Sequence, residues 1–217
     1  MFADLRNDLF FPDFSSCPDE NDISLDFYTS SDGFRWIPKH HWCLLGEIVD
    51  VTYFLRLRLL VRDRSGLEVP VAFYPDAQDP LLDYGSFRKG HTLAILYAHQ
   101  HGFLDLSVGI RQETMSAVRV IPFPLHRLLA LSDTLQTRSE ASKNSPACHT
   151  CQKESNDLLK CSRCGITWYC NKTCQQAGWR ERGHKDECGL LRNDTVKETI
   201  LFDWKQFKGF VHFPLFA

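Results

Sequence analysis

The chain has 217 residues, a hydrophobic fraction of 43% and a formal net charge of −2. This length holds one medium domain or two small ones, and the apolar content is sufficient for a hydrophobic core. No apolar run approaches the roughly 20 residues of a membrane-spanning helix, and charges interrupt the first residues, so we expect neither a membrane span nor a signal peptide.

Residues 1–39 are predicted to form an acidic N-terminal extension. They hold eight acidic residues against three basic ones. Leu9, Phe10, Phe11 and Phe14 lie among these acids, a composition found in some activation segments. Such a stretch more often packs its aromatic side chains across a neighbouring domain, and we expect that outcome here.

Residues 40–123 are predicted to form a β-domain. Leu57, Leu59 and Val61 alternate with arginines, which is the period of a strand with one buried face. The turn at 63–66 then leads into a second alternation, which indicates a hairpin. In chain order, strands are expected at residues 44–51, 55–62, 69–73, 92–98 and 104–110.

Five strands with the longest connection between the third and the fourth favour a small closed barrel, because closure leaves no exposed edge. The strand order weakly resembles the OB-fold, and a meander capped by a helix is the alternative. In such a barrel Arg56, Arg58 and Tyr74 would lie on the outer face of the second and third strands. That face is a candidate site for single-stranded nucleic acid. The alternative, which we favour, is a solvated face whose arginines are offset by nearby acids.

A connecting helix and a linker are predicted at residues 124–147. Leucines at helical spacing follow Pro124, which suits the start of a helix. A short polar stretch ending at Pro146 then separates this helix from the next region.

Residues 148–188 are the most informative region, because they hold seven of the nine cysteines in the chain. The candidate ligands are Cys148, Cys151, Cys161, Cys164, Cys170, Cys174, His184 and Cys188. They form four pairs: each C-x2-C turn aims two sulfurs at one ion, and each i, i+4 pair places two ligands on one helix face. Eight ligands are enough for two tetrahedral zinc sites. A disulfide framework is the alternative, which the histidine and the lack of an export signal oppose.

These residues resemble the MYND-type zinc finger, both in the ligand order and in the non-ligand residues Tyr169, Gln175 and Trp179. The resemblance implies an interleaved arrangement, whereas spacing alone leaves a sequential pairing open. One zinc ion would bind Cys148, Cys151, Cys170 and Cys174, and the other Cys161, Cys164, His184 and Cys188. With every position filled by protein, both ions would be structural. His149 is expected to be a bystander.

The resemblance also implies a partner, because MYND fingers have a shallow groove that accepts short proline- and leucine-containing peptides. The groove residues of the family correspond here to Ser162, Gln175 and Trp179. An indole offers a flat apolar face to a proline ring, and a glutamine amide can bond an extended peptide backbone. The alternative is that Trp179 packs over the second zinc site and Gln175 is merely solvated.

Charge disfavours nucleic-acid binding by the finger. Residues 148–188 hold seven basic and five acidic residues, and seven thiolates with two Zn²⁺ ions bring the metallated region to −1. Binding to phosphates needs a clear positive surplus, which this region lacks.

Residues 189–217 are predicted to form a helix followed by an apolar tail. Val196, Ile200, Trp204 and Phe207 are spaced as on one face of a helix, with Asn193 or Asp194 as the N-cap. The segment 209–216 is strongly apolar, so we expect it to dock on the barrel or the finger, or else to bind a partner.

No catalytic arrangement stands out in the sequence. MYND fingers occur as inserts in SET-domain lysine methyltransferases, but the chain resembles neither the glycine motif nor the Asn-His-Ser-Cys signature of that domain. Cys17 and Cys43 are expected to be packing residues, and the pair His40–His41 lacks a third ligand nearby.

The sequence therefore predicts an α+β protein with an OB-like antiparallel barrel, a MYND-like two-zinc finger and a C-terminal helix. The expected function is that of a non-enzymatic adaptor that recruits a partner's peptide, with transcriptional regulation as one setting. Single-stranded nucleic-acid binding by the barrel is the alternative. Zinc thiolates indicate a reducing compartment, the nucleus or the cytoplasm.

Overall fold

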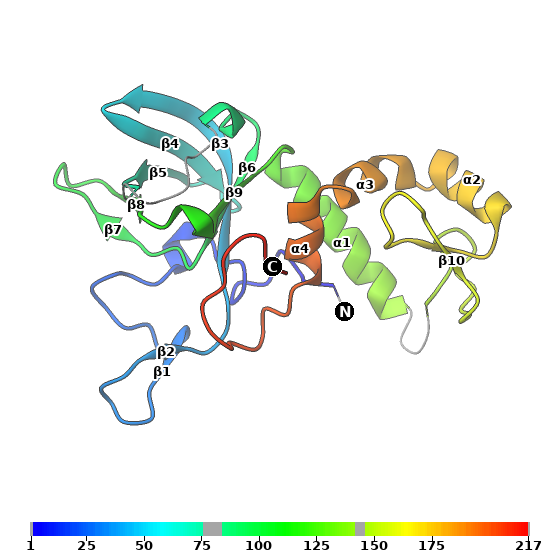
Figure 1. Cartoon of the computed structure of the whole chain (residues 1–217), viewed down its shortest axis with the longest axis horizontal. Coiled ribbons are helices and arrows are strands. Elements are labelled where there is room, and N and C mark those ends of the chain that lie inside the picture. Colours follow the sequence, from blue (N-terminus) through cyan, green and yellow to red (C-terminus); the bar gives the residue numbers. More distant parts are fainter. Residues whose placement is uncertain (1, 76–83, 142–145, 217) are drawn as a thin grey trace.

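The computed structural model describes residues 2–75, 84–141 and 146–216 (Figure 1). A β-rich half lies at one end of the molecule and the cysteine-rich region at the other, with the long helix α1, Leu125–Ala141, between them. The barrel strands come first in the chain and the four α-helices of the described residues follow, with one short hairpin at residues 159–169 between the first and second helices, so the predicted α+β class is confirmed.

The β-rich half is a barrel closed by one chain segment. Its strands are β3 (Cys43–Phe54), β4 (Arg56–Asp63), β5 (Glu68–Phe73), β6 (Thr92–Leu96), β7 (His101–Gly102), β8 (Val108–Gln112) and β9 (Val118–Ile121). β3 pairs antiparallel with β4 and β6, and β4 pairs antiparallel with β5. β8 pairs parallel with β5, and β9 pairs antiparallel with β6. Because β8 and β9 are consecutive, this segment joins both ends of the sheet, and the result is the predicted OB-like barrel.

Alternating side chains fill the barrel. Leu57, Leu59 and Val61 of β4 are buried, whereas the arginines between them are exposed, as the sequence pattern predicts. The buried carboxylate of Asp63 ends this strand by accepting the backbone N–H groups of Leu67 at 3.0 Å and of Phe14 at 2.8 Å. The turn after β4 is therefore tied to the N-terminal extension.

The prediction for the last strand was wrong at both ends. Leu104 and Leu106 do not belong to a strand: they are exposed in a tight loop before β8, where Asp105 accepts hydrogen bonds from the backbone N–H and the hydroxyl of Ser107. Alternating leucines in this loop mimic the period of a strand. A further strand, β9, follows β8 after a short 3-10 helix, and this strand was not predicted.

Short helices and hairpins make up the rest of the described structure, in both halves of the molecule. The remaining elements are the 3-10 helices Phe14–Ser16, Tyr84–Ser86 and Met115–Ala117, the hairpin of β1 (Tyr28–Thr29) with β2 (Ile37–Pro38), the hairpin of β10 (Leu159–Lys160) with β11 (Trp168–Tyr169), and the helices α2 (Lys172–Glu181), α3 (His184–Leu191) and α4 (Asp194–Leu201). Asn171 and Asn193 cap α2 and α4, each accepting a backbone N–H of the first turn.

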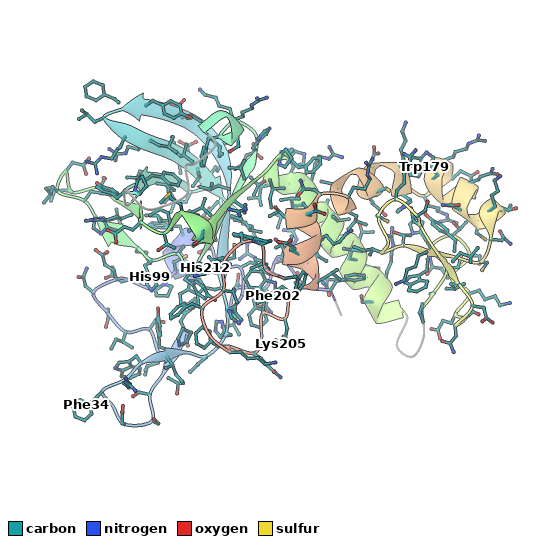
Figure 2. The ribbon with its side chains drawn as sticks, in the orientation of Figure 1. Phe34, His99, Trp179, Phe202, Lys205 and His212 are labelled. Carbon is teal, nitrogen blue, oxygen red and sulfur yellow. The ribbon has the colours of Figure 1, made fainter. Side chains whose placement is uncertain are left out.

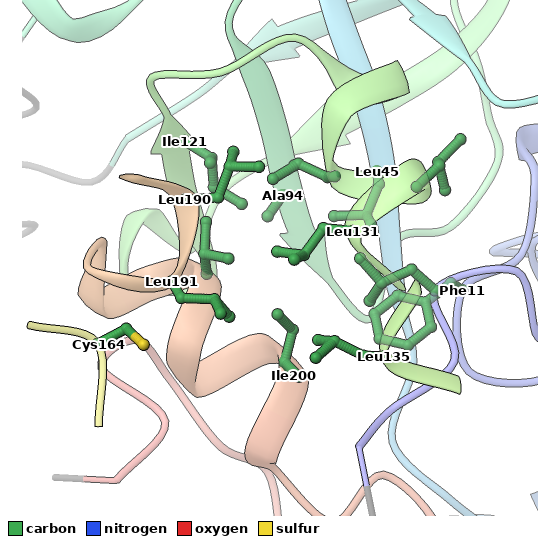
Figure 3. Close-up of a cluster of buried hydrophobic side chains, with 14 of the residues drawn as sticks. Phe11, Leu45, Ala94, Ile121, Leu131, Leu135, Cys164, Leu190, Leu191 and Ile200 are labelled. Atoms are coloured by element: carbon green, nitrogen blue, oxygen red, sulfur yellow. The ribbon is translucent and has the colours of Figure 1, made fainter. Parts of the chain in front are cut away.

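One apolar core extends across the boundary between the barrel and the helices (Figure 3). Leu45, Ala94 and Ile121 from the barrel strands meet Leu131 and Leu135 of α1. Leu190, Leu191 and Ile200 from the last two helices complete it, with Cys164 at its edge. A second cluster, which includes Leu59, Val71 and Ile110, fills the barrel itself.

The segment after α4 crosses back to the barrel. Tyr97 accepts the backbone N–H of Val211 at 3.1 Å, and the N–H of Phe213 donates to the carbonyl of Ser116 at 2.9 Å. Figure 2 shows Phe202, Lys205 and His212 along this segment. Phe213 and Leu215 are buried there, whereas Phe210 and Phe216 are exposed, so the apolar tail docks on the molecule through part of its side chains. Among the described residues, none of the helices has the length and apolar character needed to cross a membrane.

Candidate metal centres

The first group of ligands joins a turn to the start of a helix. Cys148 and Cys151 lie on a turn, and Cys170 and Cys174 lie just before and in the first turn of α2. The four sulfur atoms are all within 4.8 Å of one another, and the Cys151 and Cys170 sulfurs are 3.5 Å apart. The side-chain carbonyl of Asn171 accepts the backbone N–H of Cys174, which fixes this helix start beside the sulfurs.

The second group joins the β10–β11 hairpin to α3. Cys161 and Cys164 lie between the two strands, and His184 and Cys188 lie one turn apart on α3. All four are buried. The Cys161 and Cys188 sulfurs are 3.9 Å apart, and the Cys164 sulfur is 3.8 Å from Nε2 of His184.

These distances fit two tetrahedral zinc sites. A Zn–S bond of about 2.3 Å places two sulfurs of a tetrahedron about 3.8 Å apart. A disulfide would instead bring them to about 2.0 Å, and all nine cysteines are free thiols. The grouping is the interleaved one implied by the resemblance, so the sequential pairing left open by spacing is excluded.

The thiols are arranged for a cation. Burial raises the pKa of Cys148, but backbone N–H groups of Cys151, Thr150 and Cys170 outweigh it and lower that pKa to about 6. In the other group, burial and the neighbouring sulfurs raise the pKa of Cys188 to about 12. In the first group, the contact with the Cys151 thiol raises the pKa of Cys170 to about 12. Each group thus holds thiols that cannot all ionise without a neutralising charge, and two Zn²⁺ ions supply it.

His184 is held by a chain of polar contacts that ends on α1. Its Nδ1 lies 3.2 Å from the Thr167 hydroxyl and 3.6 Å from Glu187, which leaves Nε2 directed at the sulfurs. Arg138 of α1 donates two hydrogen bonds to Glu187, at 2.7 and 2.9 Å. Burial raises the pKa of Glu187, but the contacts with His184 and Arg138 outweigh it and lower that pKa to about 2, so the carboxylate is ionised.

His149 is not one of the eight ligands in the two groups, yet it is buried beside them. Its ring lies 5.6 Å from that of His184 and 5.7 Å from that of Tyr169, and its ring nitrogens approach Glu187 and His184. Among the described atoms, both ring nitrogens of His149 and the Tyr169 hydroxyl are buried without a hydrogen-bond partner. No pattern in the residues around His149 indicates this packing role.

The predicted peptide-binding residues border one side of the finger. Trp179 of α2 is half-buried; its ring lies 5.9 Å from that of His184, and the guanidinium of Arg163 lies over it at 5.3 Å. Gln175 is half-buried one turn earlier on the same helix, and Ser162 is exposed next to Arg163. Figure 2 labels Trp179 in the part of the finger where α2 and α3 lie side by side. Their role in binding stays a prediction.

The basic residues of the barrel face are largely matched with acids. The guanidinium of Arg56 stacks over Tyr74 at 4.0 Å, and Arg111, which sequence reasoning missed, stacks there at 4.5 Å. Arg58 lies 3.8 Å from Asp105. Two further pairs on this side, Arg62–Glu68 and Arg111–Glu113, measure 2.6 and 2.7 Å. Arg111 reaches Tyr74 only through the parallel pairing of β5 with β8.

The remaining candidates are structural. His41 is buried and hydrogen-bonded to the Tyr97 hydroxyl at 2.6 Å and to the Gln206 carbonyl at 3.0 Å. Cys17 and Cys43 are buried, and burial raises the pKa of both thiols. Neither thiol is placed to act as a nucleophile.

Comparison with known proteins identifies the finger. The MYND finger family matches residues 148–188. The mouse histone-lysine N-methyltransferase Smyd1 is 40% identical over 64 residues, which cover 27% of this chain and 13% of that protein. The Arabidopsis thaliana histone-lysine N-methyltransferase ASHR1 is 46% identical over 44 residues, which cover 20% of this chain and 8% of that protein. The chain spans a small part of the length of these relatives, and the shared part is the finger region.

Two solved structures are similar to the β-rich part at low levels. A replication protein A heterotrimer bound to ssDNA matches with 8% identity and a TM-score of 0.29, covering 52% of this chain and 87% of that one. The S. pombe Stn1–Ten1 complex matches with 17% identity and a TM-score of 0.30, covering 54% and 81%. At such scores the barrel is assigned from its own strand pairings alone.

Proposed function

We propose that the chain is a non-enzymatic adaptor, in which a MYND-like finger with two structural zinc ions recruits a short peptide of a partner protein. The construction of the finger carries this proposal. Protein atoms supply four ligands to each of two groups, so neither ion keeps an open position for water or substrate. Such ions stabilise a surface, and the function would reside on that surface.

The proposed peptide site is the side of the finger bordered by Ser162, Gln175 and Trp179. Gln175 and Trp179 are spaced i, i+4 and therefore lie on one face of α2. The half-buried indole offers an apolar surface next to the Gln175 amide, which suits a proline ring followed by an extended backbone. Arg163 over the indole would have to move aside or contact the peptide.

Single-stranded nucleic-acid binding through Arg56, Arg58 and Tyr74 is the weaker candidate. Three of the four arginines on that side of the barrel have an acidic partner within 3.8 Å. Binding to a phosphate backbone depends on a surplus of positive charge, and paired arginines provide little. The adaptor is therefore the function that the geometry supports better.

The histone-lysine N-methyltransferase activity named for the relatives is not proposed for this chain, because the similarity is confined to the finger region. In the proposed role the chain contributes binding and no chemical step. Nuclear or cytoplasmic location and a setting in transcriptional regulation are part of the same proposal.

The proposal is tested with zinc-loaded protein, Trp179→Ala and the control Trp168→Ala. Trp168 is a second half-buried tryptophan of the finger, covered by Lys160 at 4.6 Å and located on β11. The probe is a library of short peptides with fixed proline and leucine positions, and bound members are measured by fluorescence anisotropy. We expect Trp179→Ala to weaken binding at least about tenfold, a loss of about 1.4 kcal/mol or more. Gln175→Ala should weaken it less, and Trp168→Ala should not change it.

Zinc content, measured on the same samples, separates a lost contact from a lost fold. Two zinc ions per chain are expected in all variants. If Trp179→Ala keeps both ions and full peptide affinity, the peptide does not use this surface. If it loses zinc, the indole is a packing residue, and Gln175→Ala then decides whether the surface binds peptide.

A further inference from the structure

Two neighbouring loops of the barrel expose apolar side chains to solvent. The β3–β4 hairpin ends in Tyr53, Phe54 and Leu55, of which Phe54 is 78% and Leu55 is 92% exposed. The loop between β7 and β8 exposes Leu104 almost fully and Leu106 to 92%. Clusters of this kind are uncommon on isolated proteins and mark surfaces that contact other molecules.

The backbone at both loops gives a second observation. Leu55 has φ 65° and Leu106 has φ 66°, the left-handed region in which bulky residues are rare. Glycine or asparagine would form these turns with less strain. Leucine at both positions is unfavourable for the backbone and for solvation, which is understandable if the two side chains are covered by a partner.

The two loops belong to one surface. The guanidinium of Arg58 lies 5.6 Å from the ring of Phe103 and 3.8 Å from Asp105, so the β7–β8 loop contacts β4 three residues beyond Leu55. Arg56 and Arg111, whose guanidinium groups stack on Tyr74, belong to β4 and β8, the two strands that follow these loops. Figure 1 shows both loops at the end of the molecule far from the zinc finger.

We propose that this surface, named the barrel-tip surface and formed by Phe54, Leu55, Leu104, Leu106 and Arg56, docks an apolar peptide segment of a partner that carries a carboxylate. Leucine side chains gain from burying aliphatic surface and contribute little to stacking on bases, which favours a protein partner over nucleic acid. Among the described residues, no acid lies within ion-pair distance of Arg56, in contrast to the three paired arginines nearby. Arg56 is therefore the group that a partner's carboxylate would meet.

This docking site is separate from the proposed peptide site of the finger. An experiment can contradict one of the two proposals without contradicting the other. A chain with one site at each end could hold two partners at once. Variants of Leu55 and Leu106 leave the finger untouched, and Trp179→Ala leaves the barrel-tip surface untouched.

The test uses the full zinc-loaded chain and the double variant Leu55→Asn/Leu106→Asn. Asparagine accepts the left-handed conformation, so the variant removes apolar surface while keeping both turns. Leu25→Asn, at another exposed leucine, is the matched control. The probe is a random-peptide phage library selected on the wild-type chain, and enriched peptides are synthesised and measured by anisotropy on every variant.

We expect one class of enriched peptides to combine apolar residues with Asp or Glu and to bind the double variant at least about tenfold more weakly. These peptides should bind Leu25→Asn and Trp179→Ala unchanged. Replacing their acid by the matching amide should weaken binding to the wild type and have no further effect on Arg56→Gln.

Three results would overturn the proposal. The first is that no enriched peptide distinguishes the wild type from the double variant. The second is salt-sensitive binding of an oligothymidylate that the double variant abolishes, which would assign the surface to nucleic acid. The third is self-association of the wild type, seen by sedimentation and lost in the double variant, which would assign it to a second copy of the chain.

Discussion

Gly178 lies in α2 where the helix presses against the buried rings of the finger. A β-carbon at this position would be 2.6 Å from Cε1 of Tyr169, 2.9 Å from the Thr150 hydroxyl and 3.0 Å from Cδ2 of His149. These neighbours come from the ligand-bearing turn and from β11, so they cannot retreat without moving the sulfurs of the first group. Because Gly178 has no side chain, α2 can lie close to both the ligand-bearing turn and β11.

Gly178→Ala is therefore expected to destabilise the finger by about 2 kcal/mol, the usual scale for an overpacked core. It should also speed the release of zinc to a chromophoric chelator. The control is Gly189→Ala in α3, where no described atom beyond the helix's own backbone and the neighbouring residues lies within 4 Å of the added carbon. That substitution should stabilise its helix by roughly 0.5–1 kcal/mol. Equal zinc release from the two variants would contradict the packing described here.

The segment after α4 is held to the barrel through buried His41. The Gln206 carbonyl is only an acceptor, so Nε2 of His41 donates to it, and Nδ1 accepts from the Tyr97 hydroxyl. Tyr97 in turn accepts the N–H of Val211. These contacts require the neutral imidazole. Protonation of Nδ1 would remove its capacity to accept from Tyr97.

Acid should loosen this segment. Burial lowers the pKa of His41 below 6.5; the Gln206 carbonyl and Asp203 act in the opposite direction, and His40 adds to the lowering. The unfolded chain takes up a proton near pH 6.5 and the folded chain at lower pH, so stability falls as pH decreases below 6.5. His41→Gln keeps a donor and an acceptor without this proton.

We expect His41→Gln to reduce the loss of stability below pH 6.5, measured by denaturant unfolding at a series of pH values. Because burial also lowers the pKa of His99, the loss should shrink without vanishing. The exposed residue His126 provides the control variant His126→Gln, which should behave as the wild type. An unchanged pH profile for His41→Gln would show that His41 does not resist protonation in the folded chain.

Elements whose signal is local could be predicted from the sequence, and elements set by distant pairing could not. The metal ligands could be recognised because the short spacing between Cys161 and Cys164 is visible in the sequence itself. The grouping of these ligands with His184 and Cys188 depends on how the β10–β11 hairpin meets α3, which spacing does not encode. Leu104 and Leu106 misled the strand prediction because a two-residue period does not report burial.

At the scale of the whole molecule, the finger and the barrel share a core. Leu190 and Leu191 lie two and three residues after the ligand Cys188, and they pack in the same cluster as Leu45 and Ala94 of the barrel. The ion pair of Arg138 with Glu187 joins α1 to α3 at the same boundary. Loss of zinc should therefore destabilise the part of the barrel that packs on this shared core.

Removal of zinc by a chelator is expected to lower the amide-exchange protection of β6 and β9, which pack on the shared core through Ala94 and Ile121. β4 and β5 contribute to the separate barrel cluster through Leu59 and Val71, and their protection should change less. Hydrogen exchange read by mass spectrometry measures both. Equal protection of β6 with and without zinc would show that the two halves unfold independently.

The first residues of the chain are hydrogen-bonded to helices that come much later in the sequence, α1 and α4, and this has a consequence for synthesis on the ribosome. The N–H of Ala3 donates to the carbonyl of Ile200 at 2.7 Å, and that of Leu5 donates to the Ser132 hydroxyl at 2.9 Å. Translation delivers residues in order, so Leu5 and Phe11 emerge long before the helices that bury them. Until residue 200 has been made, these apolar side chains are available to chaperones, and the nascent chain cannot complete its fold.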